Sequence, residues 1–261
     1  MGYEQMSLFV DELEELAEEK TSFPEKKGSG SALQESSPED SREDARETAL
    51  SFKSSILGAK ESAAGEKSLF SAPSRYAEVS SLEELKTICL ACRGCSLCSY
   101  RTQAVFGEGN ENARLMLVGE GPGRVEDETG RPFVGQAGQL LDRILAAAGF
   151  TREEVFIGNV VKCRPPGNRL PTPQEAAACR PFLEAQIRLI KPRIIVCLGA
   201  LATQTLVDPR ARITAVRGQW FEKSGYWIIP TFHPAALLRD PSKKRPVWED
   251  FKEIRRRYDN L

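Results

Sequence analysis

The chain has 261 residues and a formal net charge of −1 at pH 7, which is unevenly divided. Residues 1–80 carry 9 Lys and Arg against 17 Asp and Glu, a net charge of −8, and the remainder carries +7. No window resembles a secretory signal and no apolar run is long enough to span a bilayer, so we expect a cytoplasmic protein without a membrane segment. In a reducing compartment, 7 cysteines favour metal or redox chemistry over structural disulfides.

Residues 1–80 are rich in Ser, Glu, Lys and Ala and have few apolar residues in any periodic arrangement. Such a segment buries too little surface to offset the entropy of ordering it, so we predict a disordered acidic extension; a small helical domain is the alternative. Residues 81–261 are enough for one α/β domain. Its positive charge fits either a polyanion-binding face or an ordinary solvated surface.

The first elements of this domain alternate between helix and strand. Leu82, Leu85 and Ile88 share one face of a predicted helix that runs into a ladder of cysteines. Residues 113–123 read as a buried strand that stops at a Gly/Pro turn. Residues 135–149 have helical spacing and a stop at Gly149.

The alternation of strands and helices continues as far as residue 239. A strand at 154–163 is followed by a proline-rich loop and by a helix at 173–190, with Thr172 as its cap. Strands at 193–199 and 226–232 enclose a short helix at 200–207. This order predicts a three-layer α/β/α fold with a mainly parallel central sheet of four strands. Ligands of such sheets bind beyond the carboxyl ends of the strands.

A glycine-rich turn follows the first strand. Gly119, Gly121 and Gly123 form GxGxG, whereas a dinucleotide fingerprint needs a further glycine where Arg124 stands, and Pro122 removes an amide donor. We therefore expect no nucleotide cofactor. The turn is suited to close approach of a ligand, or is only a tight turn.

Three further residues lie at or near the same predicted edge. His233, the single histidine, ends the last strand and is placed to donate a hydrogen bond to developing negative charge. Phe133 has the aromatic surface on which a flipped base stacks, and the amide of Asn159 complements the edge of uracil. The structural alternatives are a core phenylalanine, a turn-capping asparagine and a structural histidine.

Four cysteines, at 89, 92, 95 and 98, stand three residues apart. The series lacks the longer last step and the proline of a ferredoxin motif. One CxxC pair together with Cys163 and Cys179 would complete a four-thiolate site for Zn²⁺ or an iron–sulfur cluster. Cys197 lies within a predicted strand and is expected to be a core thiol.

Six motifs occur in one order between about Cys92 and Asp250. They are `RTQAVFGEGN`, `LMLVGEGPG`, the segment 126–142 with `TGRPFVGQAGQLLD`, `NVVKCRPPGNR`, the pair Arg217–Gly218 and `HPAALLR`. Together they resemble the type-4, iron–sulfur uracil-DNA glycosylases. The resemblance implies a monofunctional enzyme that flips uracil out of single- or double-stranded DNA and hydrolyses its N-glycosidic bond, leaving an abasic site.

The resemblance also implies roles for individual residues. Cys92, Cys95, Cys163 and Cys179 would hold a [4Fe-4S] cluster, while Cys89 and Cys98 depart from the family pattern. Phe133 would stack on uracil, Asn159 would read its edge and His233 would stabilise charge at O2. Gly119, Gly121 and Glu120 would form the pocket floor, and Glu120 or Glu126 would position water. The residues expected at DNA are Arg217, Leu237, Leu238 and Arg239, the two leucines being core residues in the alternative reading.

Two other readings stay open. One is a glycosylase for other deaminated bases, and the other is a non-catalytic, redox-sensing iron–sulfur protein that binds nucleic acid. Residues Gln5 to Phe9, `QMSLF`, resemble the pentapeptide by which bacterial repair proteins dock on the replication sliding clamp. We expect a monomer.

Overall fold

The computed structural model describes residues 75–261. The Gln5–Phe9 segment and nearly all of the expected extension lie outside the described residues. The described part includes Tyr76 and Val79, which pack in the core, so the folded domain starts a few residues before the expected residue 81. Tyr76 stacks on Phe182 with 4.5 Å between ring centroids.

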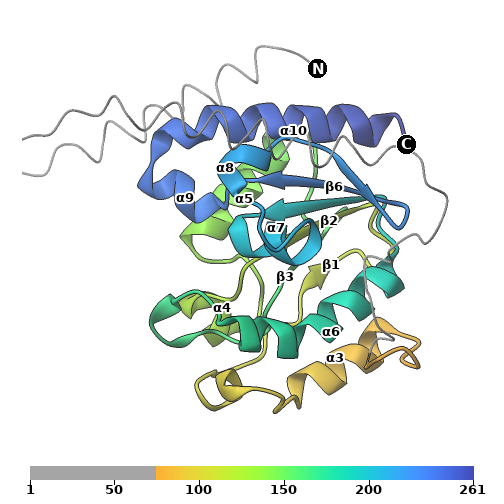
Figure 1. Ribbon diagram of the computed structural model, residues 1–261, viewed down its shortest axis with the longest axis vertical. Helices are drawn as coiled ribbons and strands as arrows, with labels where there is room; N and C mark the ends of the chain where they lie inside the picture. Colours follow the sequence, from red (N-terminus) through yellow and green to blue (C-terminus); the bar gives the residue numbers. More distant parts are fainter. Residues whose placement is uncertain (1–74) are drawn as a thin grey trace, which may run out of the picture. The chain divides into compact units, whose positions relative to one another are not determined.

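One sheet of six strands forms the centre (Figure 1). The strands are β1 (Glu108–Gly109), β2 (Leu115–Gly119), β3 (Phe156–Asn159), β4 (Ile194–Leu198), β5 (Phe221–Lys223) and β6 (Tyr226–Thr231). Their order is β1-β3-β2-β4-β6-β5, and the central four are parallel as predicted. The predicted number of four is too low, because β1 and β5 add short antiparallel edges.

Helices cover both faces of the sheet, which confirms the three-layer prediction (Figure 1). They are α3 (Leu82–Leu90), α4 (Arg124–Thr129), α5 (Gln136–Ala147), α6 (Pro173–Ile190), α7 (Ala200–Leu206), α8 (Ile213–Val216), α9 (Pro234–Arg239) and α10 (Lys244–Asp259), with 3₁₀ turns η2 (Ser96–Ser99), η3 (Pro166–Asn168) and η4 (Pro241–Lys243). Helices α3, α6 and α7 pack on one face, and α5, α9 and α10 pack on the other. None of the helices in residues 75–261 has the length and apolar content needed to cross a membrane.

Predicted helix ends are confirmed where neighbouring residues in the sequence determine them. Thr172 accepts a hydrogen bond from the Glu175 amide while the Glu175 side chain accepts from the Thr172 amide, and Pro173 opens α6. Gly149 takes φ +76° just after α5. Helix α10 was not expected; its buried residues Val247, Phe251 and Ile254 recur at helical spacing.

The strand order explains where a ligand site belongs. The chain leaves β2 to form β3 on one side of it and then returns to form β4 on the other side. The connections therefore diverge at the carboxyl end of β2, and the crevice opened there is where α/β sheets bind their ligands.

Candidate active site and cysteine centre

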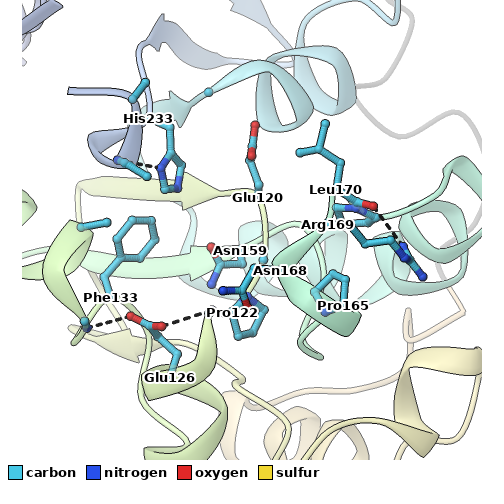
Figure 2. A pocket seen from close by; sticks show the side chains of 18 of the residues that line it. Glu120, Pro122, Glu126, Phe133, Asn159, Pro165, Asn168, Arg169, Leu170 and His233 are labelled. Carbon is cyan, nitrogen blue, oxygen red and sulfur yellow. Dashed lines mark hydrogen bonds between the residues drawn. The ribbon is translucent and has the colours of Figure 1, made fainter. Parts of the chain in front are cut away.

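A cavity of about 930 Å³ lies beyond the carboxyl ends of the parallel strands. The predicted residues that line it are Glu120, Gly121, Glu126, Phe133, Asn159, His233 and Arg239. Figure 2 shows His233 and Phe133 on one side of this space, with Glu120 and Asn159 beside them. The fold thus brings together side chains from segments more than 100 residues apart.

Phe133 is fixed in an uncommon backbone conformation. Its φ is +52°, and its side chain is buried. The Arg152 guanidinium donates hydrogen bonds to the carbonyls of Pro132 and Phe133, the latter over 3.2 Å. On α5, Gly138 permits the close approach, because a Cβ there would lie 1.9 Å from the Phe133 carbonyl oxygen. Positive φ at a residue other than glycine is strained and concentrates at functional sites.

Asn159 presents an unused acceptor. The residue is 1% exposed, and its Oδ1 has no hydrogen-bond partner within residues 75–261. A buried polar atom is rarely left unpaired, so this oxygen is available to a ligand. Gly119 keeps the space open, since a Cβ there would lie 2.4 Å from that oxygen and 2.5 Å from Cζ of Phe133.

His233 is held as a neutral ring. Its Nδ1 accepts a hydrogen bond from the Ala235 amide over 3.1 Å, which caps α9. Burial, with a smaller effect from the positive charge of Arg239, lowers the pKa of His233 to about 4, although Glu126 opposes the shift. With Nδ1 an acceptor, the neutral ring carries its hydrogen on Nε2. The ring centroid lies 5.5 Å from that of Phe133.

Glu126 is fully engaged by the backbone. Its Oε1 accepts from the amides of Val134 (3.0 Å) and Gly135 (2.8 Å), and its Oε2 accepts from Gly123 (3.1 Å). These bonds tie the start of α4 to the start of α5 around Phe133. They favour a role for Glu126 in shaping the cavity over one in positioning water.

Glu120 sits against the start of α7. Its carboxylate accepts from the Leu201 amide over 3.3 Å and from the Ala200 amide. Burial raises the pKa of Glu120, and these amides partly offset that rise. The neighbouring Gly121 has to be glycine, because a Cβ would lie 2.7 Å from Cγ2 of Val161. Of the two predicted water-positioning carboxylates, Glu126 accepts three backbone hydrogen bonds and Glu120 accepts two, both from the start of α7.

The four residues expected at DNA divide into two pairs. Arg239 lines the cavity and Leu238 is 37% exposed. The structure does not bring Arg217 or Leu237 to the cavity. The Arg217 guanidinium donates to the buried carboxylate of Asp250 over 2.5 Å, and Leu237 is 1% exposed in the core. These contacts favour structural roles, and Asp250 belongs to α10, which was not expected.

One part of the cavity wall was missed. The loop after β3 was predicted as a proline-rich connection and as part of a family motif, without a site role, yet its residues Pro165, Asn168, Arg169, Leu170 and Pro171 line the cavity. The available signal was a leucine placed between an arginine and a proline in an otherwise polar loop at the predicted ligand edge.

Six cysteines converge beside β3, around a small space of about 10 Å³. They are Cys89, Cys92, Cys95, Cys98, Cys163 and Cys179. Cys197 is fully buried in β4, away from this group, as expected for a core thiol. The fold therefore gathers the ladder with the two distant cysteines, and we call this group the cysteine centre.

Hydrogen bonds distinguish the members of the cysteine centre. Each of the four expected ligands accepts an N–H bond on sulfur: Cys92 from Gly94 N (3.3 Å), Cys95 from Leu97 N, Cys163 from Arg101 Nη1 (3.0 Å) and Cys179 from Lys162 N (3.2 Å). Within the described residues no N–H donates to Cys89 or Cys98. Hydrogen bonds to sulfur are the outer contacts that tune cluster-bound thiolates.

The thiols are not arranged as a finished metal site. In residues 75–261 no group of three or more His, Cys, Asp or Glu side chains is placed to hold a metal ion. Burial raises the pKa of Cys89 and of Cys179 to about 12. A buried thiolate therefore depends on a cation beside it.

Lys162 connects the cysteine centre to the cavity. It is 1% exposed, and its Nζ donates to the Asn159 carbonyl (2.8 Å) and to Gln186 Oε1 (2.6 Å). Its backbone amide donates to Cys179, as noted above. One buried residue thus contacts both the expected base-reading residue and an expected cluster ligand.

The sequence that forms this cavity matches a known protein family. Residues 106–252 match the family described as the uracil DNA glycosylase superfamily, which spans more than half of the chain and every cavity residue discussed above. The chain belongs to this superfamily, and the relatives described next come from one branch of it.

That branch is type 4. The chain is 52% identical to the Type-4 uracil-DNA glycosylase of Thermotoga maritima over 170 residues, covering 63% of this chain and 88% of that protein. It is 46% identical to the Type-4 enzyme of Sulfurisphaera tokodaii, covering 67% and 84%, and 42% identical to that of Archaeoglobus fulgidus, covering 67% and 92%. These similarities confirm the family expected from the motifs.

Proposed function

We propose that this protein removes uracil from DNA by hydrolysing the N-glycosidic bond, as a step in base excision repair. The observation that carries the proposal is the buried Oδ1 of Asn159, which has no partner within the described residues and lies near the Phe133 ring. The Oδ1 atom accepts from N3–H of uracil while Nδ2 donates to O4, and cytosine presents the opposite pattern. The Phe133 ring stacks on the extruded base.

His233 and the sugar's own chemistry account for bond cleavage. As the bond breaks, the sugar acquires oxocarbenium character and uracil leaves as an anion. The neutral His233 ring donates from Nε2 to O2 and stabilises that charge without giving up its proton. Glu120 orients the attacking water, and the enzyme forms no covalent bond to the sugar.

Cys92, Cys95, Cys163 and Cys179 are proposed to hold a [4Fe-4S] cluster. The donor set fits: four thiols meet beside β3, and each sulfur already accepts an N–H bond. When bound, the cluster would supply the cationic centre that buried thiolates need and would tie the segment between α3 and η2 and the loop after β3 to α6. Zinc is the alternative occupant of four thiolates.

The test is release of free uracil from uracil-containing single- and double-stranded oligonucleotides by anaerobically purified protein. Iron, sulfide and zinc are measured in the same sample. Uracil release that Asn159→Ala largely removes is the expected result. Iron-containing protein that binds DNA without releasing uracil would instead support the redox-sensing alternative, and stronger competition by hypoxanthine-containing duplex would support a broader glycosylase.

Three further proposals rest on sequence. Gln5–Phe9 docks on the replication sliding clamp, the enzyme acts as a monomer, and it works in the cytoplasm. Loss of clamp pull-down by the double variant Leu8→Ala and Phe9→Ala is the expected outcome. Unchanged pull-down by that variant ends the clamp proposal.

A further inference from the structure

One exposed leucine stands at the rim of the cavity. Five large hydrophobic side chains are exposed within residues 75–261, but among them only Leu170, at 66%, also lines the cavity. Leu238, one of the two leucines expected at DNA, is 37% exposed and is not among the lining residues. An apolar side chain left in water beside a ligand cavity is typical of a surface that the ligand covers.

The loop that carries Leu170 is held in one conformation. It lies between Pro166 and Pro171, whose rings fix the backbone. Asn168 adopts φ +56°, and its Oδ1 accepts a hydrogen bond from Arg164 Nε over 2.7 Å. Leu170 is therefore presented by a short, braced segment and is not a freely moving loop tip.

Glu175 anchors the residue next to Leu170. Its two oxygens accept two hydrogen bonds from Arg169, each 2.8 Å long, and further bonds from the Thr172 amide and Ser96 hydroxyl. The Arg169 guanidinium holds the pKa of this buried carboxyl at about 2, so the pair stays charged. Because Ser96 lies between Cys95 and Cys98, the same carboxylate ties the loop to the cysteine centre.

The chemistry of this rim suits DNA. Arg169 keeps 42% of its side chain exposed despite its ion pair, and Arg124 at the same cavity is 64% exposed. Such groups bind phosphates without reading sequence. Extruding a base leaves a gap in the stack, and proteins that distort DNA fill such gaps with apolar side chains.

We propose that Leu170 enters the DNA base stack at the position vacated by the extruded uracil. Figure 2 shows Leu170 and Arg169 across the cavity from Phe133 and His233, so the side chain reaches DNA from the side opposite α9. The inference rests on the proposed function, and it names the residue that stabilises the flipped state. Glu175 and Arg169 act as positioning residues for it.

The test compares Leu170→Ala with Leu90→Ala, which removes an exposed leucine of α3 that lines neither the cavity nor the cysteine centre. We expect Leu170→Ala to lower kcat/KM on double-stranded uracil DNA about tenfold and to change it less than about twofold on single strands, where no stack has to be opened. Leu90→Ala should match the unchanged protein on both substrates, and Leu170→Met should restore most of the loss.

A second readout separates this inference from the proposed function. Fluorescence of 2-aminopurine next to the uracil rises when its neighbour leaves the stack, whether or not the bond is cleaved. Leu170→Ala should weaken that rise at saturating protein, while Leu90→Ala should not. Equal losses on single and double strands, or an undiminished fluorescence rise, overturn the role of Leu170. Absence of uracil release by the unchanged protein overturns the proposed function instead.

Discussion

The cavity and the cysteine centre lie on either side of the short segment 159–163, yet they are built in different ways. In the cavity, hydrogen bonds within the chain already fix the functional side chains, as Arg152 fixes Phe133 and the Ala235 amide fixes His233. In the cysteine centre, buried thiols have raised pKa values and are not placed as metal ligands. The chain alone preorganises the cavity, whereas the proposed cluster would supply further positive charge beside the buried thiols.

The comparison predicts that the two regions respond differently to substitution. Asn159 and His233 are expendable for folding, because Oδ1 of Asn159 has no partner within the described residues and His233 accepts a single backbone bond. The four proposed ligands come from the segment between α3 and η2, the loop after β3 and α6, so losing one should affect stability first and activity second. Lys162 contacts both regions: its backbone amide donates to Cys179 and its Nζ donates to the Asn159 carbonyl. This one buried residue therefore links the two regions.

The largest effect is expected for Cys163→Ser. This sulfur accepts the bond from Arg101 and follows Lys162 directly, so its loss removes one of the four proposed ligands. We expect loss of iron, loss of the visible absorbance of the cluster and a thermal unfolding midpoint lowered by several degrees, with activity lost as a consequence.

Cys98→Ser is the matched control, because Cys98 lines the same small space and accepts no N–H bond within the described residues. It should keep its iron and its midpoint. If Cys89→Ser or Cys98→Ser loses iron while Cys163→Ser keeps it, the assignment of ligands is wrong.

The next largest effect is expected for His233→Ala, and here activity falls while stability changes little. One donor to a developing oxyanion is typically worth roughly 3 to 4 kcal/mol, so turnover should fall about a hundredfold or more. Loss of the cap on α9 should cost only ~0.5–2 kcal/mol, and iron content should not change.

His233→Asn separates the two contributions. Its shorter amide can still accept from the Ala235 amide, but it does not extend as far into the cavity. Single-turnover uracil release should be slowed nearly as much as in His233→Ala, with the helix cap retained. Near-normal release by either variant removes His233 from the mechanism.

The sequence was sufficient for the features that depend on local pattern. The four parallel strands are continuous apolar runs, and the cap at Thr172 and the stop at Gly149 are set by neighbouring residues. The edge strands β1 and β5 escaped notice because two or three residues carry no periodicity. Cavity residues at strand ends, such as Asn159 and His233, followed from the topology of a parallel sheet.

Long-range partners were beyond the reach of the sequence. Arg217 was expected at DNA, but its guanidinium forms an ion pair with the buried Asp250 on α10. Leu237 and Leu238 are adjacent leucines that the sequence does not distinguish. The packing of α9 buries Leu237 and leaves Leu238 exposed. Leu170 and Lys162 were missed for the same reason. Leu170 matters because the fold places it at the cavity, and Lys162 matters because its Nζ reaches Asn159 and Gln186.

The smallest expected effect concerns pH: kcat should show no titration of His233 near its ordinary pKa. This prediction tests whether the cavity is preorganised. The pKa of His233 in the folded protein is about 4, below its ordinary value of 6.5. The unfolded chain therefore takes up this proton first as pH falls, so the stability from the neutral ring is complete above about pH 6.5 and is lost toward pH 4. Because Nε2–H persists throughout, His233 should add no inflection to kcat on single-stranded uracil DNA between about pH 5 and 8. An inflection near pH 6.5 that His233→Asn abolishes would show that the ring is protonated in the working site, and the neutral donor would have to be given up.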